Sequence, residues 1–143
     1  MSTITPNQRA AHVLRLKAPA LAEAIVAEHY RQRPELERRY GGVGRQRCLE
    51  DAVFHLHFLA GSIEFGDTTI FADYTAWAAD LLARRRIPAD DVAENVRVMS
   101  RVLRDDLPPE VFELSRPHLE AALARLGNAA DQSADQADVL SRS

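Results

Sequence analysis

Proline and glycine divide this chain into segments that are each about as long as a globular helix. Between these residues the sequence is rich in alanine and leucine, and aromatic residues make up only 6% of it. This composition favours helices over strands. The expected helices cover residues 5–17, 19–33, 45–65, 69–86, 89–104 and 108–126. We therefore predict an all-α domain.

The same residues predict where the helices are interrupted. Three glycines in residues 41–44 would cost too much backbone entropy inside a helix, so this stretch is expected to be a flexible loop. Residues 35–40 before it are expected to add only a short turn. Gly66 ends the following helix, and Asp67 or Thr68 can cap the next one.

The C-terminal third contains an amphipathic helix and a polar segment. In residues 89–104 an apolar stripe recurs at helical spacing. Its members are Val92, Val96, Met99 and Leu103. Pro117 is expected to interrupt the last helix. Residues 127–143 bury too little apolar surface to offset the entropy of ordering, which predicts a mobile tail after a single domain of residues 1–126. Within this tail, Ala134 to Leu140 could extend a helix in a crystal or a complex.

The overall composition limits the partners and the location of the protein. With 143 residues and 46% hydrophobic content, the chain suits one domain around one core. A net charge of −3 argues against nucleic acid as the main partner. No apolar run is long enough to span a membrane, and the N-terminus lacks the layout of a signal peptide. We expect a cytoplasmic protein.

Residues 45–65 carry the side chains with the most chemical information. On a helical wheel, Asp51 lies about 60° and His55 about 20° from Cys48. These three residues share one face, whereas His57 falls on the opposite side. Cys48 is the single cysteine, which excludes an internal disulfide and a multi-cysteine metal site.

A thiol, a carboxylate and an imidazole on one helix are a poor match for an enzyme site. A cysteine hydrolase gathers its groups from different elements and needs an oxyanion hole. No glycine-rich turn places Cys48 at the exposed tip of a helix. Metal binding by this trio is disfavoured too, because His55 and His57 face apart. We expect a protein without enzymatic activity.

The sequence around this helix resembles a pattern of the phycobiliproteins. Tyr40-Gly41, Cys48-Leu49-Glu50-Asp51 and Phe54-His55-Leu56 are similar to that family's Tyr-Gly, Cys-Leu-Arg-Asp and Tyr-Tyr-Leu, in the same order. Further similarities are Tyr30, Pro34, Gly61-Ser62-Ile63, Gly66-Asp67, Ile87-Pro88, Val92 and Met99. The resemblance covers about Leu14 to Leu126 without large gaps.

The resemblance implies a globin-like, phycobiliprotein-type fold that binds a bilin, a linear tetrapyrrole such as phycocyanobilin or biliverdin. Cys48 matches the cysteine that forms a thioether to the bilin A-ring. Asp51 matches the aspartate that accepts hydrogen bonds from pyrrole N–H groups. The other candidate residues are expected to meet the propionates or to surround the flat rings: Arg45, Arg47, His55, Tyr74 and Trp77.

Three departures from the family pattern refine this resemblance. Too few residues precede the second helix for the two extra N-terminal helices of antenna subunits. Glu50 stands where the family has an arginine, and His55 stands where it has an aromatic residue. The chain is more similar to bacterial relatives, namely the bilin biosynthesis-associated globins and the domains that precede cobalamin-binding modules. This implies bilin carriage, storage or light sensing, with a bilin-biosynthesis or signalling protein as a candidate partner.

Two other functions stay open. A ligand-free globin module would signal through protein contacts, and side chains would fill its pocket, whereas an open polar slot would favour a tetrapyrrole. Haem bound through His55 is disfavoured, because residues 69–86, where a globin's proximal histidine would lie, contain no histidine. In each case exposed helix faces predict a homodimer or a higher homo-oligomer.

Several of these residues also have a purely structural explanation. Cys48 could be a small buried hydrophobe, and Asp51 could pair with an arginine. Tyr74 and Trp77 could be core packing. The arginines 84–86 suit a helix C-terminus, where cations oppose the dipole, or a docking patch for an acidic partner. The remaining histidines are expected at the surface or the rim: His12, His29, His57 and His118.

Overall fold

The computed structural model describes the backbone of residues 3–141 and the side chains of residues 3–128. The described backbone forms five helices and no strand: α1 (Pro6–Gln32), α2 (Glu35–Phe65), α3 (Thr68–Ala83), α4 (Ala89–Asp106) and α5 (Pro109–Ser141). This confirms the prediction of an all-α domain. None of these helices, within the described residues, combines the length and the apolarity needed to cross a membrane.

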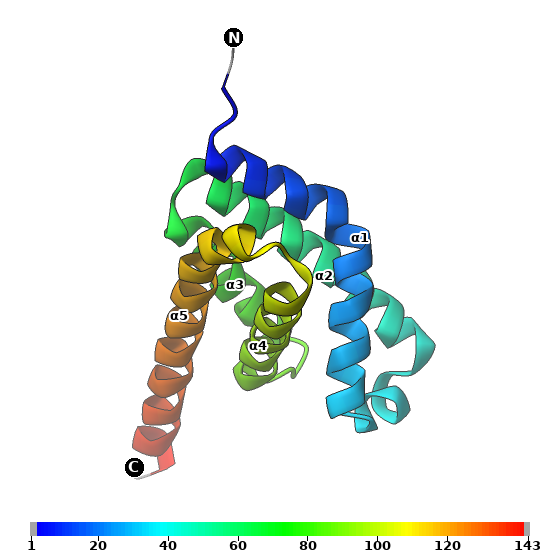
Figure 1. Cartoon of the computed structure of the whole chain (residues 1–143). Coiled ribbons are helices and arrows are strands. Elements are labelled where there is room, and N and C mark those ends of the chain that lie inside the picture. Colours follow the sequence, from blue (N-terminus) through cyan, green and yellow to red (C-terminus); the bar gives the residue numbers. More distant parts are fainter. Residues whose placement is uncertain (1–2, 142–143) are drawn as a thin grey trace.

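The helices enclose one hydrophobic core. α1 and α2 run antiparallel and form the most extensively packed pair, while α3 and α4 both pack against α5 (Figure 1). All five helices contribute fully buried side chains, among them Leu14, Leu59, Phe71, Met99 and Leu119. α4 also packs against α1, so that parts of α1, α2 and α4 come together on one side of the core.

α1 is a single helix that continues through Pro19. The prediction of two separate helices is therefore wrong. A proline inside a helix costs about 3 kcal/mol, but the apolar face of α1 continues on both sides of it. Leu14 and Ala18 before the proline are fully buried, as are Leu21 and Ala22 after it. Burial of this continuous stripe in the core offsets the lost backbone hydrogen bond.

α2 is kinked at one residue rather than interrupted by a loop. Gly41 has φ 66° and ψ −165°, a conformation that is essentially restricted to glycine. The residues after it are already helical, so the loop predicted for residues 41–44 is wrong in extent, and residues 35–40 form the first turns of α2. A Cβ atom on Gly44 would lie 2.3 Å from Tyr40 Cβ. The helix can restart this close to the kink because residue 44 is a glycine.

Gly66 and Asp67 separate α2 from α3, as predicted. Gly66 ends α2 in the left-handed region, with φ 65° and ψ 29°. The Asp67 side chain caps α3, because its Oδ1 accepts a hydrogen bond from the Thr69 N–H at 2.9 Å. α3 ends at Ala83, and the arginines 84–86 follow as a turn rather than as part of the helix.

α4 and α5 complete the core. The apolar stripe predicted for α4 is confirmed. Its four members are all buried: Val92, Val96, Met99 and Leu103. α5 continues through Pro117 to Ser141, so the predicted interruption and the predicted end near Leu126 are both wrong. Buried residues occur on both sides of this proline, from Val111 to Leu126, and favour one helix. Residues 142 and 143 lie outside the described residues, and the mobility of the tail stays a prediction.

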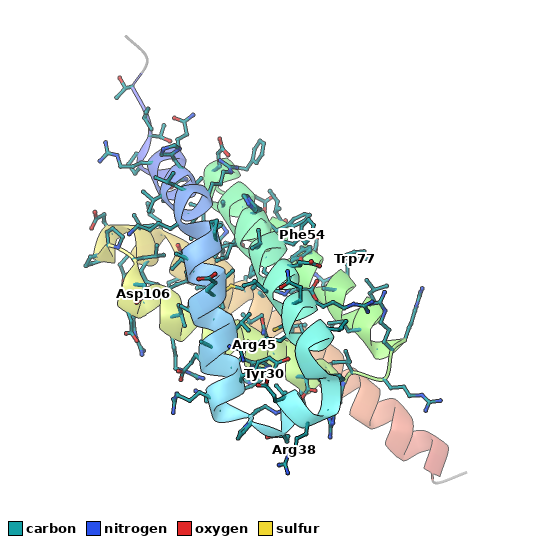
Figure 2. All side chains as sticks on the ribbon, turned by 90° about the vertical axis from the view of Figure 1, so that its right-hand side faces the viewer. Tyr30, Arg38, Arg45, Phe54, Trp77 and Asp106 are labelled. Atoms are coloured by element: carbon teal, nitrogen blue, oxygen red, sulfur yellow. The ribbon has the colours of Figure 1, made fainter. Side chains whose placement is uncertain are left out.

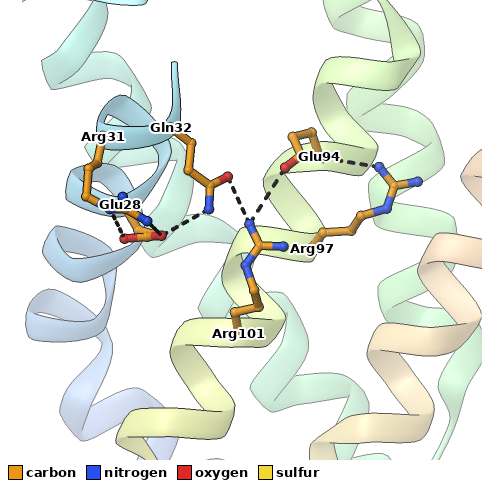
Figure 3. A network of polar contacts seen from close by, with 6 residues as sticks. All are labelled: Glu28, Arg31, Gln32, Glu94, Arg97 and Arg101. Carbon is orange, nitrogen blue, oxygen red and sulfur yellow. Dashed lines mark hydrogen bonds and ion pairs between the residues drawn. The ribbon is translucent and has the colours of Figure 1, made fainter. Parts of the chain in front are cut away.

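A network of polar side chains ties the end of α1 to α4 (Figure 3). Its members are Glu28, Arg31, Gln32, Glu94, Arg97 and Arg101. Arg101 is central, because its Nη2 donates to Gln32 Oε1 at 2.9 Å and lies 3.7 Å from a Glu94 carboxylate oxygen. Exposed ion pairs contribute little stability one by one. The network therefore chiefly fixes how the end of α1 lies on α4.

Candidate functional site

A cavity of about 490 Å³ lies among α1, α2, α4 and the end of α3 with the turn that follows it. Small-molecule sites usually measure about 300–1,000 Å³, so this cavity is large enough for an organic ligand. Four of the predicted binding residues line it: Arg47, Cys48, Asp51 and His55. Its apolar wall consists of Leu36, Val43, Leu82, Ile87 and Val92.

The face of α2 predicted to carry the chemistry is the face that lines this cavity. Cys48 and His55 are half-buried, and Asp51 is exposed at the rim. His57 is exposed and is not part of the cavity lining, as the helical wheel predicts. One stretch of α2, after the kink, therefore presents a thiol, a carboxylate and an imidazole to the same cavity.

Tyr74 of α3 holds His55 in place. The Tyr74 hydroxyl lies 2.8 Å from His55 Nδ1. Burial lowers the pKa of His55 to about 4, while burial and the Asp51 carboxylate raise the pKa of Tyr74 to about 12. Both groups are neutral at pH 7. Their hydrogen bond fixes the imidazole ring and leaves Nε2 as its second polar atom.

Neither Tyr74 nor Trp77, both expected to surround a flat ligand, is part of the cavity lining. Tyr74 stacks on Phe58 with ring centroids 4.0 Å apart, and Trp77 is tilted against Tyr74 at 6.2 Å. Trp77 is 61% exposed, and Figure 2 shows it and Phe54 pointing outward from α3 and α2. Tyr74 thus lies behind His55, and Trp77 belongs to an exposed aromatic surface.

Arg45 also lies outside the cavity lining. Its guanidinium is 4.9 Å from the centroid of the Tyr30 ring (Figure 2) and 3.6 Å from the Glu37 carboxylate. Tyr30 itself lines the cavity, so Arg45 packs behind the wall. A different arginine, Arg85 from the turn after α3, lines the cavity in its place.

Cys48 and Asp51 are both harder to ionise than usual. Burial, reinforced by the Asp51 carboxylate, raises the pKa of the Cys48 thiol to about 11. Although Asp51 reaches solvent at the rim, the surrounding protein and the neighbouring Glu50 raise its pKa, and Arg85 and Arg47 counteract them. Since the thiolate is the reactive form of cysteine, Cys48 is a weak nucleophile at pH 7.

Four further polar residues of the cavity were not predicted from the sequence: His29, Arg33, Asp91 and Asn95. The surface or rim position expected for His29 is wrong, because this residue is only 7% exposed. It lies four residues after Ile25 on the buried face of α1, and this spacing is the signal that identifies it. Arg33 donates to Asp91 at 2.9 Å and to Glu35 at 3.0 Å.

Two buried polar atoms of the cavity residues have no hydrogen-bond partner within the part of the chain that the structure describes. They are Nδ1 of His29 on α1 and Oδ1 of Asn95 on α4. Burial, helped by Arg33, lowers the pKa of His29, so its imidazole is neutral at pH 7. An unpaired buried polar atom costs about 1–3 kcal/mol, and native structures retain few of them.

The surface position expected for His118 is wrong as well. His118 is 6% exposed, and its Nδ1 lies 2.7 Å from Ser62 Oγ between α2 and α5. It is not part of the cavity lining. His12 and His57 are exposed, as predicted. Among the histidines, only His29 and His55 line the cavity.

Comparison with known proteins does not assign the chain to a family. No protein-family model matches the sequence, and no curated protein matches it either. Among the described residues, no group of three or more His, Cys, Asp or Glu side chains is arranged to hold a metal ion. The function is therefore inferred from the chemistry of the cavity.

Proposed function

We propose that this chain is a globin related to the phycobiliproteins, most similar to the bilin biosynthesis-associated globins, and that it binds a linear tetrapyrrole in the cavity. Its role is to carry or store the bilin, or to sense light through it. The observation that carries this proposal is that Arg47, Cys48 and Asp51, which the resemblance assigns to bilin binding, line one cavity together with His55. The all-α architecture supports the globin part of the proposal.

The cavity offers suitable contacts for the rings of a bilin. Its aliphatic wall suits the apolar faces of the rings. The Asp51 carboxylate accepts hydrogen bonds from the pyrrole N–H groups and favours the protonated form of the ring system. His55, held by Tyr74, offers one more polar atom along the same wall.

Arg47 and Arg85 are the candidate partners for the two propionates. Both line the cavity and are exposed, and neither forms an ion pair within the described residues. A guanidinium can bind a carboxylate through two parallel hydrogen bonds. Arg45, which the sequence suggests for this role, instead contacts Tyr30 and Glu37.

Covalent attachment at Cys48 is a second part of the proposal. The sulfur adds to an ethylidene or vinyl carbon of the bilin. A C–S bond forms, the π bond of the C=C group breaks, and the thiol proton moves to the neighbouring carbon, so that no oxidant or reductant is needed. With a thiol pKa of about 11, only about one thiol in ten thousand is ionised at pH 7. Non-covalent binding therefore comes first, and attachment follows slowly.

The two alternative functions differ in what the cavity would contain. A ligand-free module would have side chains in place of the cavity of about 490 Å³. Haem would use Nε2 of the neutral His55 as its iron ligand. α3 contains no histidine that could bind the iron as a proximal ligand. Haem is therefore the weaker alternative.

Absorption spectra test the non-covalent part. The purified protein is exposed separately to biliverdin, a reduced bilin and haem. We expect it to shift a bilin spectrum, Asp51→Asn to lose this shift, and His57→Ala, on the same helix but outside the cavity, to keep it. No shift with either bilin would contradict the proposal. A Soret band that disappears in His55→Ala would establish haem binding instead.

A denaturing gel tests the covalent part. The protein is co-expressed with a bilin-producing system and stained with zinc, which makes attached bilins fluoresce. We expect fluorescence from the wild type and none from Cys48→Ala. Equal signals from the two proteins would contradict attachment at Cys48 but leave non-covalent binding intact.

A further inference from the structure

The wall of the cavity is divided between charged and neutral polar groups. The charged residues Arg47, Asp51 and Arg85 are exposed at its rim. Its inner part includes His29 of α1, which is buried, and Asn95 of α4, which is half-buried but has a buried Oδ1 atom. A ligand therefore meets charges near solvent that are unpaired among the described residues, and inside it meets neutral polar groups beside the Arg33–Asp91 ion pair.

The buried part contains polar atoms that the described residues leave unpaired. His29 is 93% buried, because it is only 7% exposed. Neither its Nδ1 nor Asn95 Oδ1 has a hydrogen-bond partner among the described side chains and backbone, although both atoms are buried. The two residues come from different helices and line the same cavity. Two residues of one cavity thus each carry a buried polar atom without a partner among the described residues, which makes them candidates for contact with a ligand.

Nearby charges define what that partner can be. Arg33 already donates to Asp91 at 2.9 Å and to Glu35 at 3.0 Å, so its charge is neutralised. A carboxylate in the buried part would meet the Asp91 carboxylate without a free cation. A cation would find no free carboxylate either, because Asp91 and Glu35 are both held by Arg33. The partner of His29 and Asn95 is therefore neutral.

We propose that His29 and Asn95 bind a lactam, with Asn95 Oδ1 accepting from the lactam N–H and His29 Nδ1 donating to the lactam carbonyl. The terminal rings of a bilin are lactams, so this assignment rests on the proposed function and deepens it. It places one terminal ring in the buried part and the propionates at Arg47 and Arg85. Burial keeps the His29 imidazole neutral, and a neutral imidazole has one nitrogen that can donate in this way.

Titration with biliverdin tests this assignment. We expect Asn95→Leu and His29→Leu each to weaken binding about tenfold, because each removes a hydrogen bond made in the buried part. The matched control is His57→Leu, at an exposed histidine outside the cavity, which should bind like the wild type. Thermal melts of the ligand-free proteins show whether the variants fold, and Asn95→Leu should melt no lower than the wild type. Two folded variants that bind within about twofold of the wild type would overturn the assignment.

A small lactam separates this inference from the bilin proposal. The probe is 2-pyrrolidinone, followed by NMR at the Asn95 side-chain amide and the His29 ring. We expect both signals to shift, and N-methyl-2-pyrrolidinone, which lacks the N–H, to leave the Asn95 signal in place. If 2-pyrrolidinone shifts both NMR signals but the protein does not bind biliverdin, the proposed bilin binding is refuted and the lactam site is supported. If 2-pyrrolidinone shifts neither signal and the protein does not bind biliverdin, both the lactam site and the proposed bilin binding are overturned.

Discussion

Ser62 Oγ and His118 Nδ1 lie 2.7 Å apart where α2 meets α5. The Ser62 hydroxyl donates its single proton to the Asp67 carbonyl at 2.6 Å. His118 Nδ1 must therefore carry a proton and donate to Ser62. The Phe71 N–H also donates to Ser62 Oγ, at 3.3 Å. One buried hydroxyl thus connects the end of α2, the beginning of α3 and α5.

Ser62→Ala is expected to lower the free energy of unfolding by about 2 kcal/mol, because the donors on His118 and Phe71 lose their acceptor inside the core. Chemical denaturation measures this loss. Ser115→Ala is the matched control: Ser115 is equally buried, but it donates only to the Val111 carbonyl of its own helix. The control should lose less than about 1 kcal/mol. Equal losses would contradict the connecting role of Ser62.

The lowered pKa of His55 predicts a loss of stability in mild acid. Its pKa is about 4 in the folded protein and about 6.5 in an unfolded chain. The unfolded chain therefore binds a proton that the folded protein does not bind. The free energy of unfolding should fall as the pH drops from about 6.5 towards 4, by at most about 3 kcal/mol.

Melting temperatures over this pH range, compared between variants, assign the effect. His55→Gln should flatten the curve and His57→Gln should not, because His57 is exposed. The flattening is partial, since burial lowers the pKa of His29 and of His118 as well. A curve for His55→Gln as steep as that of the wild type would show that another group causes the loss.

Two glycines after the kink in α2 should respond to alanine in opposite directions. Gly44→Ala places a Cβ atom 2.3 Å from Tyr40 Cβ, which should cost about 1–3 kcal/mol. A Cβ atom on Gly42 meets nothing within 4 Å, and alanine is favoured over glycine in a helix by about 0.5–1 kcal/mol. Denaturation of the two variants compares them directly. A destabilised Gly42→Ala together with a neutral Gly44→Ala would refute the described geometry of the kink.

The rate of bilin attachment to Cys48 should rise with pH. Because the thiol pKa is about 11, the thiolate fraction grows about tenfold per pH unit below that value. Single-turnover attachment at saturating bilin, followed by the absorption change, gives this dependence. A rate that does not depend on pH would mean that the thiolate addition is not the slow step.

Arg85 should recognise a carboxylate of the ligand. We expect Arg85→Gln to weaken biliverdin binding by about fivefold to tenfold and to leave the binding of biliverdin dimethyl ester unchanged, because the ester carries no negative charge. Arg45→Gln, outside the cavity, is the control and should affect neither ligand. Titrations followed by absorption measure both. An equal effect of Arg85→Gln on the acid and on the ester would rule out a charge contact.

The sequence predicts the parts of the site that depend on one helix alone. Cys48, Asp51 and His55 line one cavity because helix geometry fixes which residues share a face. The choice between Arg45 and Arg85 depends on where α3 ends and how it packs against α2, and the spacing of residues along one helix does not contain that information. The burial of His118 similarly depends on Ser62, which lies 56 residues earlier.

Two prolines of this chain do not break the helices that contain them. The sequence predicts helix breaks at Pro19 and Pro117, yet α1 and α5 continue through both. The local cost of proline is real, but the core contacts of a long apolar face outweigh it. At Gly41 the sequence predicts a flexible loop, whereas the unusual backbone angles of this one residue only bend α2.

The kink at Gly41 affects the shape of the cavity but not the side chains that line it. Leu36 and Tyr40 line the cavity from one side of the kink, and Cys48 and Asp51 line it from the other, but Gly41 itself is not part of the lining. The angle between the two stretches thus sets how far apart these walls stand. A substitution at Gly41 would therefore change the size of the ligand that fits the cavity, although Gly41 does not line the cavity and every residue that contacts the ligand stays the same.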